Sequence, residues 1–258
     1  MTGINGLSRL PRLYIEPTLV PDAHEGATCP ILPEQARYLG TVLRKKVEEQ
    51  VRVFHAGMGE WLASIAELRK DRGTVALQRQ IRSPQACPPL RLAFALLKRD
   101  ATDLVLRMGT ELGVSEFLPI MTERTNTHRT NPERLHAIAV EAAEQCERLD
   151  IPAIAPVQTL PALLGNWPQQ TTLFAAIERL DAREGGGAVQ APPHVRAGDG
   201  LLIGPEGGLS EGECKTLLTR PFIAPISLGS LVLRADTAVV AGLALLGNGL
   251  RSAPVSSQ

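Results

Sequence analysis

The first third of the chain alternates apolar and polar positions over short stretches bounded by turn residues, which is typical of β-strands. The pattern predicts three strands, at Gln50–His55, Trp61–Leu68 and Gly73–Ile81. Pro33–Arg44 has helical spacing instead, so we expect one helix there. Its apolar face consists of Ala36, Leu39, Val42 and Leu43. Strands that close on themselves beside a short helix predict a small β-barrel.

From Leu90 onward, apolar runs alternate with longer segments of helical spacing. Runs that suit buried strands occur at Leu90–Leu97, Phe117–Met121 and Leu173–Ile177, and twice more near the C-terminus. Helices are expected at Ala101–Leu112, between Asp100 as cap and Gly113 as terminator, at 131–149 and at Thr237–Leu246. This alternation predicts an α/β domain with a parallel sheet. The Pro-rich stretch Ser83–Pro89 is the expected linker.

Two motifs near the C-terminus share one pattern. Leu201–Gly208 (LLIGPEGG) and Ile226–Ala238 (ISLGSLVLRADTA) each combine an apolar run, a break containing Gly and a helix-forming segment. Ser210 and Glu213 form a capping box, so a helix should begin just after the first break. Ligands of open α/β sheets bind where strands end and loops diverge. The pair therefore predicts one pocket of nucleoside size, although GPEGG is also compatible with a simple strand-to-helix turn.

The pocket is expected to have main-chain walls together with three leucine side chains, Leu228, Leu231 and Leu233. Neither the Walker A pattern nor the dinucleotide fingerprint occurs in the sequence, so a common phosphate cradle is not predicted. The four cysteines and five histidines are dispersed without metal-ligand spacing, so we expect no protein-held metal and no disulfide framework. No apolar run has the length of a signal peptide or a membrane span, and we expect a cytoplasmic protein.

Net charge is zero but unevenly distributed. The first 100 residues hold 15 Lys and Arg against 10 Asp and Glu, and the remainder holds 12 against 17. A basic N-terminal part suits contact with phosphates, while a solvated basic face would give the same bias.

Four segments of the chain, in this order, resemble one family. They are Tyr38–Trp61, Arg107–Arg124 (RMGTELGVSEFLPIMTER), Glu141–Pro152 (EAAEQCERLDIP), and LLIGPEGGLS with the following LG…LR…DTA stretch. Together they resemble the ribosomal RNA uracil-N3 methyltransferase family, which belongs to the SPOUT class of trefoil-knotted enzymes. GPEGG alone is moderately specific, whereas four ordered segments span most of the chain.

The resemblance implies a PUA-like RNA-binding β-barrel at 1–84 and a SPOUT methyltransferase domain with a C-terminal knot at 85–258. It also implies a homodimer, S-adenosylmethionine as cofactor, and 16S ribosomal RNA or the small ribosomal subunit as partner. Carried onto this sequence, the expected cofactor-binding residues are Ile203, Gly204, Pro205, Glu206, Gly207, Leu228, Gly229, Leu231, Leu233 and Thr237.

Methylation of uridine N3 requires the loss of a proton and stabilisation of the charge that spreads onto O2 and O4. Arg234 on the second motif is our candidate for that stabilisation, the alternative being a structural arginine paired with Asp236. Glu206 could act as a base, but a carboxylate just before a helix more often caps main-chain N–H groups.

N3 lies on the Watson–Crick edge, so the target uridine must be unpaired or flipped out. A separate domain that grips the RNA is therefore useful. The candidate RNA-binding residues are Arg37, Arg44, Lys45, Lys46, Arg124 and Arg129, each of which could equally be a solvated surface residue.

The chain departs from the family pattern at several positions. The family usually has Arg at Leu231, Thr-Glu at Ala235-Asp236, Lys at Met108 and Gly at Glu147. Two fewer positive side chains would weaken phosphate binding. Two alternatives to an RNA methyltransferase follow: a non-catalytic RNA-binding or assembly factor that retains the fold, and an enzyme that binds another adenine nucleotide, such as ATP or NAD, at GPEGG.

Overall fold

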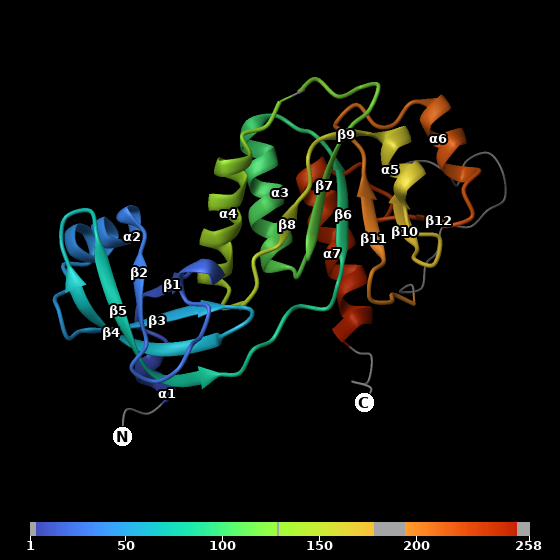
Figure 1. Cartoon of the computed structure of the whole chain (residues 1–258). Helices are drawn as coiled ribbons and strands as arrows, with labels where there is room; N and C mark the ends of the chain where they lie inside the picture. Colours follow the sequence, from blue (N-terminus) through green and yellow to red (C-terminus); the bar gives the residue numbers. More distant parts are fainter. Residues whose placement is uncertain (1–3, 128, 178–193, 252–258) are drawn as a thin grey trace. The chain divides into compact units, whose positions relative to one another are not determined.

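The computed structural model describes residues 4–127, 129–177 and 194–251. The chain forms two compact units (Figure 1). The first comprises Met1–Ala86 and Ala143–Ile151, and the second comprises Cys87–Ala142 and Pro152–Gln258. The segment 143–151 thus belongs to the first compact unit, and the domain boundary expected after residue 84 stays a prediction.

The first unit is built on a five-stranded sheet with the order β1-β3-β4-β5-β2. Its strands are β1 (Arg12–Tyr14), β2 (Thr28–Ile31), β3 (Gln50–His55), β4 (Gly59–Leu68) and β5 (Gly73–Arg82), and its short helices are α1 (Ile4–Leu7) and η1 (Pro17–Leu19). The three predicted strands are confirmed as β3, β4 and β5. Strands β1 and β2 lie at the edges and were not predicted, because neither has more than four residues.

The single helix predicted at Pro33–Arg44 is wrong. An α-helix, α2 (Pro33–Arg37), leads directly into a π-helical turn, η2 (Tyr38–Val42), in which the N–H of Leu43 donates to the carbonyl of Tyr38. A π turn inserts an extra residue and rotates everything that follows it about the helix axis. Ala36 and Leu39 are buried as predicted, but Val42 is 67% exposed and the adjacent Leu43 is 37% exposed.

A network of buried ions crosses the sheet of the first unit. Glu60 is fully buried and accepts from Arg12 at 2.8 Å, from Arg52 at 3.2 Å and from Arg82 at 3.2 Å. The Arg12 guanidinium also lies 3.4 Å from the centre of the Phe54 ring. Burial lowers the pKa of Arg12, and Glu60 opposes that shift. The local sequence pattern did not predict this network.

Arg12, Arg52 and Arg82 also bond to residues 143–151. Arg12 donates to the carbonyls of Ala143 and Arg148, each at 2.7 Å, and Arg82 donates to the carbonyl of Glu147 at 2.6 Å. The side chain of Glu147 in turn forms an ion pair with Arg52 at 3.0 Å. These bonds explain why residues 143–151 belong to the first unit.

Glu147 has a φ of 60°, in the left-handed region that favours glycine. This conformation gives a physical reason for glycine in the family pattern, and the ion pair with Arg52 offsets the strain here. We expect Glu147→Ala, which keeps the strain and loses the ion pair, to be less stable than Glu147→Gly by about 1 kcal/mol. Urea unfolding of the two variants measures this difference, and an alanine variant as stable as the glycine variant would contradict the explanation.

The second unit contains a parallel sheet with the order β12-β10-β11-β6-β7-β8, and β9 pairs with the far end of β7. The strands are β6 (Arg91–Ala95), β7 (Glu116–Met121), β8 (Ala153–Ile154), β9 (Gln158–Thr159), β10 (Leu173–Ala176), β11 (Gly200–Ile203) and β12 (Ile223–Ile226). The predicted parallel α/β domain is confirmed. The strand expected to begin at Ile226 instead ends there, so the leucines of the second motif follow the strand.

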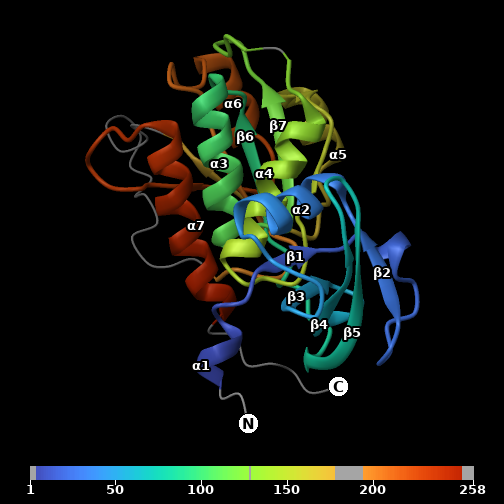
Figure 2. The ribbon, with the colours of Figure 1, turned by 90° about the vertical axis from the view of Figure 1, so that its left-hand side faces the viewer.

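Helices cover both faces of this sheet (Figures 1 and 2). They are α3 (Arg99–Glu111), α4 (Pro132–Gln145), α5 (Leu160–Asn166), α6 (Glu211–Leu218) and α7 (Ala235–Arg251). Apolar residues of α3, α4 and α7 share one core cluster, and those of α5 and α6 share another with the opposite sheet face. The cap predicted for α3 is wrong, since the helix begins at Arg99 with Lys98 in the cap position and Asp100 in its first turn.

Helix α7 returns from the edge strand across the sheet. It follows the edge strand β12 but packs against α3 and against β11, which is the second strand from β12 in the sheet. A Cβ on Gly242 would lie 2.6 Å from the Leu201 side chain, so this position of the helix packs closely on β11. Residues 227–234 therefore connect the edge strand β12 to a helix that packs against β11. The trefoil knot itself stays a prediction.

Candidate functional site

The two motif loops both begin at the carboxyl ends of strands in the parallel sheet. Residues 204–210 follow β11 and residues 227–234 follow β12, and both strands pair in parallel with β10, which lies between them. Their carboxyl ends are therefore on one side. Ile203, Ile226 and Ala235 belong to a single apolar cluster beneath the loops.

The first loop is a tight turn that ends in a capped helix. The N–H of Gly208 donates to the carbonyl of Pro205 at 2.8 Å, and Gly208 has a φ of 68° with open space where a Cβ would lie. Ser210 accepts from the N–H of Glu213 at 3.2 Å, and the Glu213 carboxylate accepts from the N–H of Ser210 at 2.8 Å. The predicted capping box is confirmed.

The second loop is open and mostly exposed. Gly229 has a φ of 115° with no atom near its Cβ position, and its N–H donates to the Ser227 hydroxyl at 3.3 Å. Leu228 packs partly against the core, whereas Leu231 is 77% exposed. Thr237 is exposed on the first turn of α7, where its N–H donates to the Asp236 carboxylate at 2.7 Å.

Main-chain groups in both loops are available to a ligand. Within the described residues, the N–H groups of Glu206 and Gly207 and those of 230–233 donate to no acceptor. Such groups recognise the edge of a planar, polar ring, while the half-buried Leu228 and Leu233 offer it an apolar surface. The two loops thus suit a nucleoside bound mainly through the main chain.

The candidate catalytic side chains are both exposed. Glu206 makes no hydrogen bond in the part of the chain that the structure describes, and Glu213 caps the helix instead, so the preference for Glu206 as a cap is wrong. Arg234 likewise has no ion pair among the described residues, and the Asp236 carboxylate faces Thr237. The alternative of an Arg234–Asp236 pair is therefore not supported.

One further residue contacts the first loop. Arg124, in the turn after β7, donates from Nη1 to the carbonyl of Gly207 at 2.8 Å. Its neighbour Glu123 donates its main-chain N–H to the Glu213 carboxylate at 2.9 Å. From the sequence we expected Arg124 only as an RNA contact, since no local pattern indicates a bond between residues 83 positions apart.

Comparison with known proteins decides the family. Residues 84–247 match a family model described as an RNA methyltransferase domain, and residues 31–78 match one described as an RNA methyltransferase PUA domain. Ribosomal RNA small subunit methyltransferase E of Rickettsia conorii is 34% identical over 215 residues, covering 82% of this chain and 86% of that protein. The chain belongs to the ribosomal RNA small subunit methyltransferase E family.

Solved structures agree with this assignment. A methyltransferase from Legionella pneumophila, in complex with its cofactor S-adenosylmethionine, is 27% identical with a TM-score of 0.79. The family member from Neisseria gonorrhoeae, bound to S-adenosylmethionine, is 24% identical with a TM-score of 0.81. Both alignments cover 93% of this chain and 98% of the other chain, so the likeness extends over both compact units.

The PUA-like unit presents basic and apolar side chains together around α2 and η2. Arg37, Arg44 and Lys46 are exposed, whereas Lys45 forms an ion pair with Glu49 at 3.0 Å. Tyr38, Val42, Leu43 and Val47 are the exposed large apolar residues of this region. Three of the four basic residues predicted here are thus available to phosphates, and Lys45 is shared with a carboxylate.

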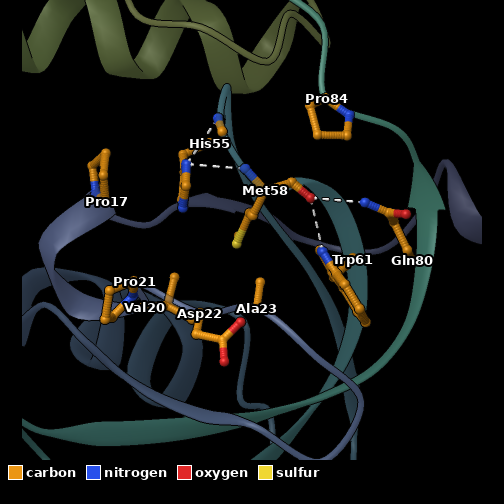
Figure 3. Close-up of a pocket in the computed structure, with 11 residues that line it drawn as sticks. Pro17, Val20, Pro21, Asp22, Ala23, His55, Met58, Trp61, Gln80 and Pro84 are labelled. Carbon is orange, nitrogen blue, oxygen red and sulfur yellow. Dashed lines mark hydrogen bonds between the residues drawn. The ribbon is translucent and has the colours of Figure 1, made fainter.

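The PUA-like unit also contains a hollow of about 390 Å³ that none of the predicted site residues line (Figure 3). His55 lies at its wall, and its Nδ1 accepts from the N–H groups of Gly57 at 3.1 Å and Met58 at 3.3 Å. Trp61 and Gln80 both donate to the carbonyl of Met58. These bonds assign His55 a structural role as the acceptor that closes the β3–β4 turn.

Burial lowers the pKa of His55 below its usual value of 6.5, against smaller opposing effects of the Val20 carbonyl and Glu16. As the pH falls, the His55 imidazole is protonated in the unfolded chain before it is protonated in the folded chain. The free energy of unfolding therefore decreases progressively below about pH 6.5. His55→Asn keeps an acceptor for the turn but does not titrate, so we expect a shallower loss of stability between neutral and acidic pH.

Urea unfolding across that pH range measures the effect. The wild-type chain, measured under the same conditions, is the reference for the slope of this pH dependence. A His55→Asn profile that coincides with the wild type would contradict the role assigned to burial.

Among the described residues, no three His, Cys, Asp or Glu side chains are grouped so that they could hold a metal ion. No helix in the described ranges has both the length and the apolar character needed to cross a membrane.

Proposed function

We propose that this chain is an S-adenosylmethionine-dependent methyltransferase that methylates N3 of a uridine in 16S ribosomal RNA. The observation that supports this function most directly is the pair of motif loops, which bring unbonded main-chain groups to one edge of the parallel sheet in a member of this family. The relatives from Legionella pneumophila and Neisseria gonorrhoeae were solved with S-adenosylmethionine bound.

The residues of the two loops fit this cofactor. The unbonded N–H groups of residues 206 and 207 and of 230–233 suit the polar edge of adenine, and Leu228 and Leu233 suit its faces. Ile203, Gly204, Pro205, Gly229, Leu231 and Thr237 complete the proposed cofactor site. When bound, the cofactor supplies an electrophilic methyl group, and transfer requires the nucleophile to approach that carbon in line.

The residues of the chain act on the uridine. The charge that develops on O2 and O4 when N3 loses its proton needs a nearby cation. Arg234 fulfils this need, because its guanidinium is exposed and has no ion-pair partner in the described residues. Glu206 is exposed on the other loop and is the candidate to accept the N3 proton.

The RNA is held by arginines and lysines that contact phosphates while the target base is unpaired or flipped out. We assign this role to Arg37, Arg44, Lys45 and Lys46 on the PUA-like unit and to Arg129 on the methyltransferase unit, whereas Arg124 bonds to the Gly207 carbonyl. We place the protein in the cytoplasm, where ribosomal subunits lie, and propose that it acts as a homodimer. Light scattering after size-exclusion chromatography tests the homodimer. We expect a molar mass twice that of one chain.

Mass spectrometry of ribosomal RNA tests the function. In 16S RNA from cells that lack this protein, we expect one N3-methyluridine to be missing and to return with the wild-type chain but not with Arg234→Ala. An unchanged set of methylated nucleosides in the deletion strain would reject the proposed activity. Calorimetric titration with S-adenosylmethionine then separates the remaining alternatives, because a non-catalytic factor would show no binding and a different nucleotide enzyme would prefer ATP or NAD.

A further inference from the structure

The turn after β7 fixes the orientation of one peptide unit in the first motif loop. The carbonyl of Gly207 accepts from Arg124 at 2.8 Å, and the N–H of Gly208 in the same peptide unit donates to Pro205 at 2.8 Å. A peptide unit is planar, so bonds at both of its ends determine how it faces. The adjoining N–H groups of Glu206 and Gly207, which donate to no described acceptor, are directed by that orientation.

A second tether holds the far end of the same loop. Glu213 accepts from the N–H of Glu123 with one carboxylate oxygen and from the N–H of Ser210 with the other, at 2.9 and 2.8 Å. The consecutive residues Glu123 and Arg124 therefore hold residues 204–210 at two points. The side-chain carbons of Arg124 also lie 3.5–3.6 Å from where a Cβ of Gly207 would be, so the arginine packs along the loop.

Loops without such bonds lose conformational freedom when a ligand binds, and that loss weakens affinity. Gly207 and Gly208 add freedom that a loop of other residues would not have. A charge-assisted hydrogen bond to a main-chain carbonyl is stronger than a neutral one and suits this task.

We propose that Arg124 is a positioning residue for the methyl donor, acting through the Gly207 carbonyl rather than on the reacting atoms. This inference rests on the proposed function, since it takes residues 203–207 as part of the cofactor site. It gives Arg124 a role distinct from the phosphate contact expected from the sequence.

Calorimetric titration of S-adenosylmethionine into the full-length protein tests the proposal. Arg124→Met keeps the aliphatic contact with Gly207 and removes the donor, so affinity should fall about tenfold, the equivalent of one charge-assisted hydrogen bond. Arg124→Lys should restore part of the affinity. Arg220→Met, at an exposed arginine beyond α6, should bind like the wild type.

Steady-state kinetics distinguishes a loss of cofactor positioning from a general loss of folded, active enzyme. The KM for S-adenosylmethionine should rise about tenfold in Arg124→Met, while kcat at saturating donor stays within about threefold of the wild type. Because Arg124 is exposed, thermal midpoints close to the wild-type value are expected for both variants.

Two outcomes overturn the proposal. If Arg124→Met binds S-adenosylmethionine like the wild type but binds RNA more weakly, with a salt dependence reduced by about one phosphate contact, Arg124 is a phosphate ligand and the loop does not need it. If the wild-type protein itself does not bind S-adenosylmethionine, the proposed function fails, and the positioning role fails with it.

Discussion

Arg234→Ala is expected to lower kcat for methylation of 16S ribosomal RNA by roughly 100-fold, because it removes the cation that stabilises charge on the uracil ring. The affinity for S-adenosylmethionine should change little, since the cofactor is proposed to contact the main chain of the second loop. Arg234→Lys keeps the charge but not the planar donor pair, so an intermediate rate is expected. Single-turnover transfer of a labelled methyl group measures the effect.

The matched control is Arg220→Ala. Arg220 is also an exposed arginine of the methyltransferase unit, and it lies outside both motif loops. Its variant should methylate at the wild-type rate. Equal rates for Arg234→Ala and the wild type would remove Arg234 from the mechanism and leave the cofactor site as the only functional assignment on the second loop.

Glu60→Ala is expected to destabilise the PUA-like unit by about 3–5 kcal/mol, the usual cost of removing one partner from a buried ion network. Glu60 is fully buried, and its loss leaves the buried Arg12 without its carboxylate and Arg52 paired with Glu147 alone among the described residues. The expected loss is large relative to the total stability of a small domain. The tether to residues 143–151 should weaken as well, because Arg12 and Arg82 hold that segment.

Urea unfolding followed by tryptophan fluorescence measures this change. Trp61 and Trp167 are the only tryptophans of the chain, so in a Trp167→Phe background the signal reports the PUA-like unit alone. Glu67→Ala on the same strand is the control, since Glu67 is half-exposed and its ion-pair partner among the described residues is the exposed Arg69. We expect the control to lose less than about 1 kcal/mol. Similar losses in the two variants would show that burial of Glu60 adds nothing to the stability of the unit.

Local patterns predicted those features that depend on neighbouring residues. Strand β3 has the predicted bounds, Gln50–His55, because its alternation is regular and a glycine-rich turn follows it. The Ser210–Glu213 capping box was found from a spacing of three residues. The parallel α/β unit followed from apolar runs long enough to be buried on both faces.

Features that depend on distant residues were not predictable in this way. Strand β1 has only three residues and exists by pairing in parallel with β3, where Arg12 lies opposite Arg52. Both arginines are buried because Glu60, on β4, neutralises them, and no local pattern shows that arrangement. The bond from Arg124 to Gly207 is of the same kind.

The π turn at Tyr38–Val42 explains why the apolar spacing of this segment wrongly predicted that Val42 and Leu43 are buried. The sequence has an apolar stripe at the spacing of an α-helix, but the i to i+5 bond of Leu43 ends that spacing after Leu39. Val42 and Leu43 become exposed next to Arg44.

In the candidate site, the sequence predicted Leu228, Leu231 and Leu233 as the wall of a cleft. In the structure Leu231 is exposed, and only Leu228 and Leu233 are half-buried.

A crystal structure of the chain with S-adenosylmethionine bound is the most direct measurement. We expect the adenosine of the donor to lie between residues 203–207 and 228–233, with hydrogen bonds to main-chain groups, and Arg124 to donate to the Gly207 carbonyl as it does here. Donor density at any other place on the molecule would contradict this expectation.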